Sequence, residues 1–166
     1  KMVKTLLDMS ELQTVSRDET IAVDALVDEV LVDLEPLAQE KEIKLIGNCK
    51  DTTMVGSDIL IYRMVYNLVE NAIKYNHFGG QVTVTAYRSG KNICLSVEDT
   101  GSGIPAELKE RIFEPFFRVD KSRSRQLGGV GLGLALVREI VRVHDGRITV
   151  QSSPSGGTIF EVVFTQ

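Results

Sequence analysis

The architecture of this chain follows from the stretch Asn67-Leu-Val-Glu-Asn-Ala-Ile-Lys-Tyr75, the end of a helical pattern that begins at Asp58. On a helix, its four polar side chains fall within an arc of about 100°, and apolar side chains occupy the opposite side. These polar residues are Asn67, Glu70, Asn71 and Lys74. Each asparagine inside a helix costs about 0.5 kcal/mol relative to alanine. Two of them four residues apart therefore indicate amide oxygens that share a target.

The same polar face has the chemistry of a metal and phosphate site. Neutral amide oxygens are hard donors suited to Mg²⁺, which takes few protein ligands and completes its shell with water and substrate phosphates. Lys74, one turn beyond Asn71, adds a point charge that can meet a phosphate. Taken alone, the helix leaves a second interpretation open, because a solvated face is the usual meaning of such a pattern.

A second block, Asp99-Thr-Gly-Ser-Gly-Ile-Pro105, follows an alternating strand-like run. A strand that ends in aspartate before tight glycine turns places a carboxylate at the edge of a sheet. That carboxylate can accept a hydrogen bond from an exocyclic amine, while Gly101 and Gly103 let a planar ring approach the main chain. The alternative is an ordinary turn in which the aspartate binds its own backbone.

A third block, Gly129-Val-Gly-Leu-Gly-Leu134, opens a helix predicted from Gly131 to about His144. Glycines at a helix start leave the first N–H groups free to bind an anion, and the helix dipole assists. The basic run from Arg118 to Arg125 lies just upstream and suits a triphosphate. No strand leads into the glycines, which argues against a Rossmann dinucleotide site. A flexible loop followed by a helix cap is the alternative.

Between the second and third blocks, Pro105 is expected to start a short helix that runs to Arg111. Phe113-Glu-Pro-Phe-Phe-Arg118 follows, and a polar stretch without periodicity extends from Glu114 to Val130. A loop of that length is uncommon in a compact domain unless it is functional or mobile.

Composition narrows the class of protein. The chain has 166 residues, is 43% hydrophobic and has a net charge of −4, which indicates one globular domain. The acidic balance argues against a nucleic-acid or anionic-membrane binder. No apolar stretch is long enough to span a bilayer, so we expect a cytosolic domain and leave membrane anchoring of a longer parent open. Cys49 and Cys94 lack metal-ligand spacing and are expected to be buried and reduced.

Periodicity and turn residues predict helices and strands around these blocks. Asp24 is expected to cap a helix that runs to about Lys41 and that Pro36 should kink or break. The last two strands are expected to pair as a hairpin at the centre of the sheet. The predicted strands are Thr20–Val23, Ile43–Asn48, Gln81–Arg88, Asn92–Glu98, Arg147–Gln151 and Thr158–Phe164. Helices grouped against such a sheet indicate an α+β two-layer sandwich.

In their order and spacing, these blocks resemble the N, G1, F and G2 boxes of the catalytic, ATP-binding domain of bacterial sensor histidine kinases. Gly156-Gly-Thr158 resembles the final glycine box, and the likeness runs from about Thr20 to Phe164. The resemblance implies the Bergerat fold of gyrase, Hsp90 and MutL, in which a mixed sheet packs on three main helices. It also implies a bound ATP beneath a mobile lid, here from about Glu114 to Val130.

The resemblance implies roles for individual residues. Asn71 resembles the Mg²⁺ ligand, with Asn67 supporting it, and Lys74 resembles the lysine that contacts phosphate. Asp99 resembles the carboxylate that receives the adenine amino group, and Arg118 the lid cation nearest the γ-phosphate. Mg²⁺, Lys74 and Arg118 would supply most of the catalysis. The other nucleotide contacts are expected at Tyr75, Gly101, Gly103, Ile104, Phe117, Gly129, Gly131, Leu132, Gly133 and Thr158.

The family's phosphoacceptor block, His-(Glu/Asp)-x-x-(Thr/Asn)-Pro, does not occur in this sequence. His77 and His144 are instead expected to be structural or solvent-facing. Residues 1–16 resemble the end of the dimerisation hairpin, and residues 17–166 the catalytic domain. The resemblance therefore implies a kinase domain that binds Mg·ATP, cannot phosphorylate itself, and passes the γ-phosphoryl to a histidine on a dimerisation domain. Its implied partners are that domain and a response-regulator receiver domain, within a homodimeric parent.

Two other functions stay open. One is an ATPase switch of the same fold, in which Glu70 would activate water; the Phe113–Arg118 block and the short lid argue against it. The other is a nucleotide sensor or an anti-sigma-factor-type serine kinase. The helix predicted from Lys1 to about Val15 argues against that second function, because it suggests a dimerisation hairpin upstream.

Overall fold

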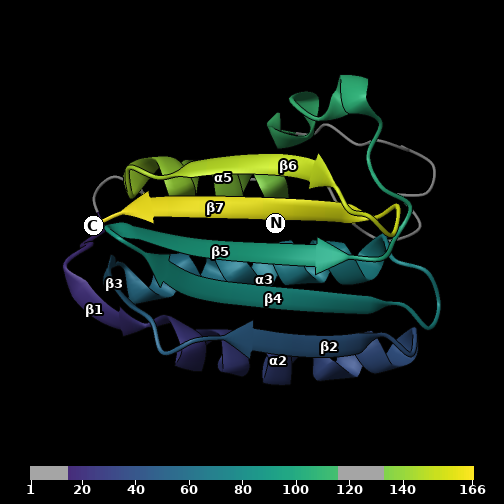
Figure 1. The fold of residues 1–166 in the computed structure, drawn as a ribbon, viewed down its shortest axis with the longest axis horizontal. Helices are drawn as coiled ribbons and strands as arrows, with labels where there is room; N and C mark the ends of the chain where they lie inside the picture. The colour runs from purple at the N-terminus through teal and green to yellow at the C-terminus, as the bar shows by residue number, and fades with distance from the viewer. Residues whose placement is uncertain (1–14, 116–132) are drawn as a thin grey trace.

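A five-stranded mixed sheet forms one layer of the structure, and the described helices form the other (Figure 1). The computed structural model describes residues 15–115 and 133–166. The strand order is β2-β4-β5-β7-β6; β2 and β4 are parallel, and the other neighbours are antiparallel. The strands are β2 (Lys44–Cys49), β4 (Gln81–Ser89), β5 (Asn92–Asp99), β6 (Arg147–Ser152) and β7 (Thr158–Thr165). The predicted α+β sandwich is confirmed.

Three helices in the described part of the chain cover one face of this sheet: α2 (Val23–Glu40), α3 (Asp58–Lys74) and α5 (Gly133–Val143). The core lies between the layers, where apolar side chains of α3 meet those of the central strands. Met64 and Leu68 on α3 and Phe160 on β7 are almost completely buried there. No described helix combines the length and the apolar character needed to cross a bilayer.

A second, small sheet lies beside the main one. It pairs β1 (Glu19–Ala22) with β3 (Thr53–Gly56) in antiparallel register. The sequence analysis placed β1 within a residue but did not anticipate β3, because four residues give too short a period-two pattern to recognise. β3 leads directly into Ser57, the N-cap of α3, so this small sheet fixes where α3 starts.

The start of α2 corrects one prediction. Asp24 does not cap this helix; it lies in the first turn, and Ala22 is the N-cap without a side-chain hydrogen bond. The reason is a tertiary contact, since the N–H of Val23 donates to the carbonyl of Thr52 at 2.8 Å. A backbone acceptor thus replaces the side-chain cap that a helix start usually needs.

Pro36 does not break α2, which continues from Val23 to Glu40. Proline frees the carbonyl four residues earlier, which here belongs to Val32. The side chains of Val32 and Pro36 are both exposed, so the freed carbonyl lies on the solvent side of the helix. Solvation of that group explains why the helix tolerates proline at this position.

Two further predictions differ from the structure. The hairpin of β6 and β7 exists, but only β7 is interior, between β5 and β6, whereas β6 is an edge strand. The helix expected from Pro105 to Arg111 is instead two short 3-10 turns, Ala106–Leu108 and Arg111–Phe113. Short 3-10 turns are common connectors where no long apolar stripe is present.

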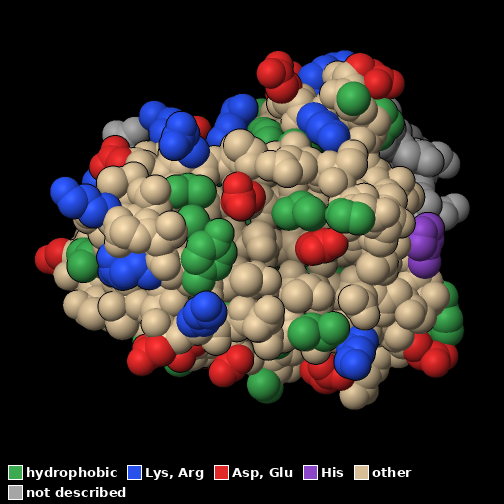
Figure 2. Space-filling view, in the orientation of Figure 1, with side chains coloured by type: hydrophobic (Ala, Val, Ile, Leu, Met, Phe, Trp, Pro, Cys, Tyr) green, Lys and Arg blue, Asp and Glu red, His purple; other side chains and the backbone are tan. Residues whose placement is uncertain are grey.

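The face of the sheet opposite the helices carries no helix of the described chain (Figure 1). Figure 2 shows this face, where apolar side chains alternate with acidic and basic ones and form no continuous apolar patch. Thr83, Thr85 and Ser96 are half-buried on it, which fits an antiparallel sheet with one solvated side.

Candidate nucleotide-binding site

The helix α3 presents the polar face that its sequence predicts. Ser57 caps the helix, and its hydroxyl oxygen accepts the N–H of Leu60 at 3.3 Å. Every apolar residue expected on the inner side is buried, whereas the polar positions Asn67, Glu70, Asn71 and Lys74 are half-buried. The prediction of one apolar and one polar face is confirmed.

The polar face of α3 lies against the beginning of α5. The amide nitrogen of Asn67 donates to the carbonyl of Arg63 at 2.7 Å, and its oxygen makes no hydrogen bond to another described residue. That oxygen would lie 3.5 Å from a β-carbon placed on Gly133, the first residue of α5. The structure therefore brings the predicted metal-binding helix and the predicted phosphate-binding helix start together. One turn along α3, the ammonium of Lys74 lies 3.8 Å from the carboxylate of Glu70.

Asp99 ends β5 in a nearly closed environment, with 6% of its surface exposed. Its Oδ1 atom accepts the N–H of Gly101 at 2.8 Å and the N–H of Thr158 at 3.2 Å. Burial raises the pKa of this carboxyl, and the two backbone hydrogen bonds oppose that shift. Within the described chain, Oδ2 has no hydrogen-bond partner, so one acceptor oxygen remains for a ligand.

Glycines let the backbone close tightly around this carboxylate. A β-carbon on Gly101 would lie 2.4 Å from the carbonyl oxygen of Tyr75, and one on Gly157 would lie 2.0 Å from the carbonyl oxygen of Asp99. Gly103 has φ +75° and would also collide with the Gly156 carbonyl. These contacts bring Tyr75, Gly101, Gly103 and Thr158 together around Asp99.

A buried amide links this carboxylate to the end of α3. Asn76 is 1% exposed; its Oδ1 accepts the hydroxyl of Thr100 at 3.1 Å and the N–H of His77 at 2.8 Å. Its Nδ2 donates to the carbonyl of Gln81 at 3.0 Å. The sequence analysis did not identify Asn76 as part of the site. Its position directly after Tyr75, at the end of the helix, is the sequence feature that could have indicated this role.

The loop between β6 and β7 is held by a second polar contact that the sequence did not reveal. The hydroxyl of Ser153 donates to the carboxylate of Glu98 at 2.5 Å. Ser153 is buried, and its N–H also donates to the carbonyl of Gly157 at 2.9 Å. This contact fixes the loop whose next residue, Thr158, binds Asp99.

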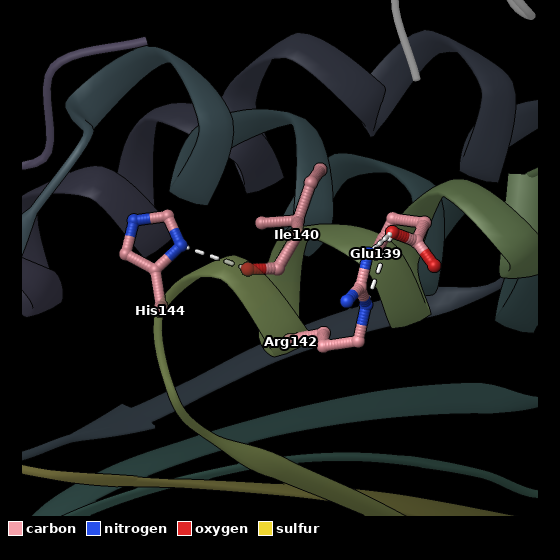
Figure 3. A network of polar contacts seen from close by, with 4 residues as sticks. All are labelled: Glu139, Ile140, Arg142 and His144. Carbon is pink, nitrogen blue, oxygen red and sulfur yellow. Dashed lines mark hydrogen bonds and ion pairs between the residues drawn. The ribbon is translucent and has the colours of Figure 1, made fainter. Parts of the chain in front are cut away.

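The two histidines take the structural and exposed roles expected of them. His144 is buried, and its Nδ1 lies 2.8 Å from the carbonyl of Ile140 (Figure 3). Its Nε2 accepts the N–H of Ser57 at 3.0 Å. Burial lowers the pKa of His144, which favours the neutral ring that this pair of bonds requires. His77 is exposed in the turn after α3. Figure 3 also shows Arg142, near the end of α5, which forms an ion pair with Glu139 at 2.6 Å.

Several predicted site residues lie outside the described residues: Phe117, Arg118, Gly129, Gly131 and Leu132. Ile104 is half-buried against the core, two residues beyond the Asp99 turn. Phe113 is buried and meets Phe160 edge-on, with ring centroids 6.1 Å apart. The segment that carries the predicted lid therefore starts from a point anchored in the core.

With this geometry in place, comparison identifies the class of protein. Residues 56–166 match the family described as "Histidine kinase-, DNA gyrase B-, and HSP90-like ATPase". The match covers more than half of the chain and includes α3, the Asp99 turn and β7. The chain belongs to this family of ATP-binding domains.

Similar proteins narrow the class to sensor histidine kinases. The sensor-like histidine kinase SenX3 of Mycobacterium tuberculosis is 39% identical over 163 residues, which is 96% of this chain but 40% of that protein. The nucleotide-free catalytic domain of the histidine kinase ThkA superposes with a TM-score of 0.80 at 27% identity, covering 90% of this chain and 96% of that domain. The fold is thus that of a histidine kinase catalytic domain, and the chain spans less than half the length of SenX3.

A second solved structure contains such a domain in a signalling complex. Histidine kinase ThkA bound to the response regulator protein TrrA matches 99% of this chain and 46% of the kinase, with a TM-score of 0.79 at 26% identity. These relatives favour the kinase over the ATPase switch and the serine kinase.

Proposed function

We propose that this chain is the ATP-binding catalytic domain of a two-component sensor histidine kinase. It would transfer the γ-phosphoryl of ATP to a histidine on the dimerisation domain of its parent. The observation that carries the proposal is the buried carboxylate of Asp99, closed in by glycine backbone and lying beside the end of the asparagine-bearing helix α3. Family membership and the kinase relatives support the same conclusion.

Adenine recognition is assigned to the Asp99 pocket. Oδ1 is already occupied by two backbone N–H groups, so Oδ2 would accept the exocyclic amine of the base. A burial-raised pKa marks a carboxylate that is poorly solvated and therefore gains from a ligand donor. Gly101 and Gly103 let the backbone close around Asp99, and Tyr75, Ile104 and Thr158 would line the pocket.

Metal and phosphate binding is assigned to the polar face of α3. Asn71 would ligate Mg²⁺ through its amide oxygen, with Asn67 supporting the phosphates beside Gly133. This donor set fits the ion, because Mg²⁺ prefers oxygen ligands and takes few from the protein. A bound Mg²⁺ supplies neutralisation of phosphate charge. Lys74 would hold a phosphate once released from Glu70, and Arg118 would approach the γ-phosphate from the lid, together with Phe117, Gly129, Gly131 and Leu132.

The wider assembly is also part of the proposal. Residues 1–16 would end the dimerisation hairpin, residues 17–166 would form the catalytic domain, and the parent would be a homodimer. A receiver domain of a response regulator would take the phosphoryl group, as the complex of ThkA with TrrA suggests.

Calorimetry with a non-hydrolysable ATP analogue tests the site assignment. Asn71→Ala should weaken binding about tenfold with Mg²⁺ present and change little without it, because it removes one metal ligand. Asn48→Ala, which changes an exposed asparagine on β2, is the matched control. A loss of affinity that is equal with and without Mg²⁺ would contradict the metal role, and absence of binding by the parent chain would contradict the function.

A further inference from the structure

Lys41 ends α2 and reaches across to the end of α3. Its ammonium donates to three backbone carbonyls, those of Ile73 at 3.3 Å, Lys74 at 3.0 Å and Asn76 at 2.8 Å. An ammonium has three N–H donors, so this arrangement matches its full hydrogen-bonding capacity. The last carbonyls of a helix lack intrahelical partners and carry partial negative charge, which a cation satisfies.

The backbone around Lys41 holds the same turn. The carbonyl of Lys41 accepts the N–H of Gly79 at 2.9 Å, and the N–H of Lys44 donates to the carbonyl of Gly80 at 3.0 Å. Residues 73–80 are thereby attached to the junction of α2 and β2 through both side-chain and main-chain contacts.

The opposite side of this turn is the wall of the proposed adenine pocket. The carbonyl of Tyr75 packs so closely on Gly101 that no side chain fits between them, and Asn76 bonds Thr100, the residue after Asp99. The end of α3 therefore contacts Lys41 through the carbonyls of residues 73, 74 and 76, and it contacts the Asp99 turn through Tyr75 and Asn76.

We propose that Lys41 is a positioning residue that sets this spacing, so that one nucleotide reaches Asp99 with its base and Asn71 with its metal-bound phosphates at once. The proposal rests on the proposed function, since it concerns the same two half-sites. The printed hydrogen bonds of the Lys41 side chain go to backbone carbonyls of residues 73, 74 and 76, so Lys41 would act through this turn. A fixed spacing raises the affinity for a ligand that contacts both half-sites, because the second contact then forms without further ordering of the protein.

The test separates spacing from simple stability. We expect Lys41→Met to lower the affinity for the Mg-bound ATP analogue about tenfold. Its affinities for adenosine alone and for Mg-tripolyphosphate alone should stay within about twofold of those of the parent chain. Amide hydrogen exchange at residues 75–80 should quicken in the same variant. Lys44→Met is the matched control, because Lys44 is exposed and its side chain makes no hydrogen bond or ion pair with another described residue.

Conservative variants add a second readout. Lys41→Arg keeps the charge but replaces the compact ammonium with a planar fork, so it should recover part of the lost affinity. Lys41→Gln keeps an NH₂ group that can donate hydrogen bonds but carries no charge. It serves in place of Lys41→Met if the methionine variant does not fold.

Two outcomes overturn the inference. Unchanged affinity of Lys41→Met and Lys41→Gln for the full nucleotide would show that the contact sets no spacing. An equal loss for the nucleotide and both of its halves would show a role in stability alone. A parent chain that binds no nucleotide would instead contradict the proposed function, and the inference with it.

Discussion

Asp99 carries opposite effects on stability and on binding. Its carboxyl is buried, and burial raises its pKa above the ordinary 3.8, so the folded state disfavours the ionised form. At neutral pH the negative charge of Asp99 therefore lowers the free energy of unfolding. This destabilisation is lost as the pH falls below the folded-state pKa, because the carboxyl is then protonated. The pocket thus keeps a charge that the fold alone would not favour.

Asp99→Asn should separate these effects. The amide oxygen can keep the two backbone bonds, so thermal melting at pH 7 should occur at the same or a higher temperature than in the parent chain. Nucleotide affinity should fall about tenfold to a hundredfold, because a hydrogen bond to a charged acceptor is lost. Asp51→Asn, at an exposed position, is the control. A variant that is less stable yet binds normally would contradict the assignment.

Gly157 is a second residue whose replacement reports on the pocket. A β-carbon there would lie 2.0 Å from the carbonyl oxygen of Asp99, which is backbone and cannot move aside cheaply. Gly157→Ala should lower the free energy of unfolding by about 1–3 kcal/mol. It should also weaken nucleotide binding, because the neighbouring Thr158 N–H loses its position on Asp99.

Chemical denaturation and calorimetry measure both effects of Gly157→Ala. Gly90→Asn is the control, since Gly90 has φ +63° in an open turn that asparagine tolerates. Normal stability and affinity in Gly157→Ala would show that the turn rearranges freely.

At the scale of elements, His144 joins the end of α5 to the beginning of α3. It needs a neutral ring, because Nε2 accepts the Ser57 N–H while Nδ1 donates to the Ile140 carbonyl. Burial lowers its pKa, the charge of Arg17 lowers it further, and the bond to Ile140 and the charge of Asp145 oppose this. The unfolded chain therefore binds the proton more tightly than the folded chain.

The free energy of unfolding should accordingly fall as the pH drops. The contribution of His144 is fully present above its ordinary pKa of 6.5 and is lost as the pH falls through the lower folded-state value. Urea titrations between pH 8 and pH 5 measure it. His144→Gln should be about 1–2 kcal/mol less stable at pH 8 and should show a flatter pH dependence. His77→Gln, at the exposed histidine, should keep the slope of the parent; an equal flattening there would contradict the assignment.

The elements also show what the sequence could predict. The bounds of α3 were predicted to within one residue, because a long amphipathic stripe and a serine cap determine them locally. The candidate site residues Asn67, Asn71 and Asp99 could be proposed from the sequence because each lies in a short contiguous block. Contacts made between elements were not found: the backbone cap of α2 by Thr52, and the hold of Lys41 on α3, depend on the assembled fold.

At the scale of the whole molecule, the chain should need a separate phosphoacceptor. Of its two histidines, His144 is buried with both ring nitrogens engaged, and His77 lies in an exposed turn. Incubation with γ-labelled ATP should leave the chain unlabelled, and a separately produced dimerisation domain of its parent should become labelled in its presence. Asn71→Ala should reduce that transfer at least tenfold. Acid-labile phosphate on this chain would contradict the prediction.

The interior position of β7 sets the order in which the domain can be made. β7 pairs with β5 on one side and β6 on the other, so residues 158–165, which follow the other described strands in the sequence, join β6 to the rest of the sheet. A nascent chain that stops before β7 leaves both β5 and β6 with unpaired edges, which invite pairing with other chains. On the ribosome, folding of the domain must therefore wait until these residues have left the exit tunnel.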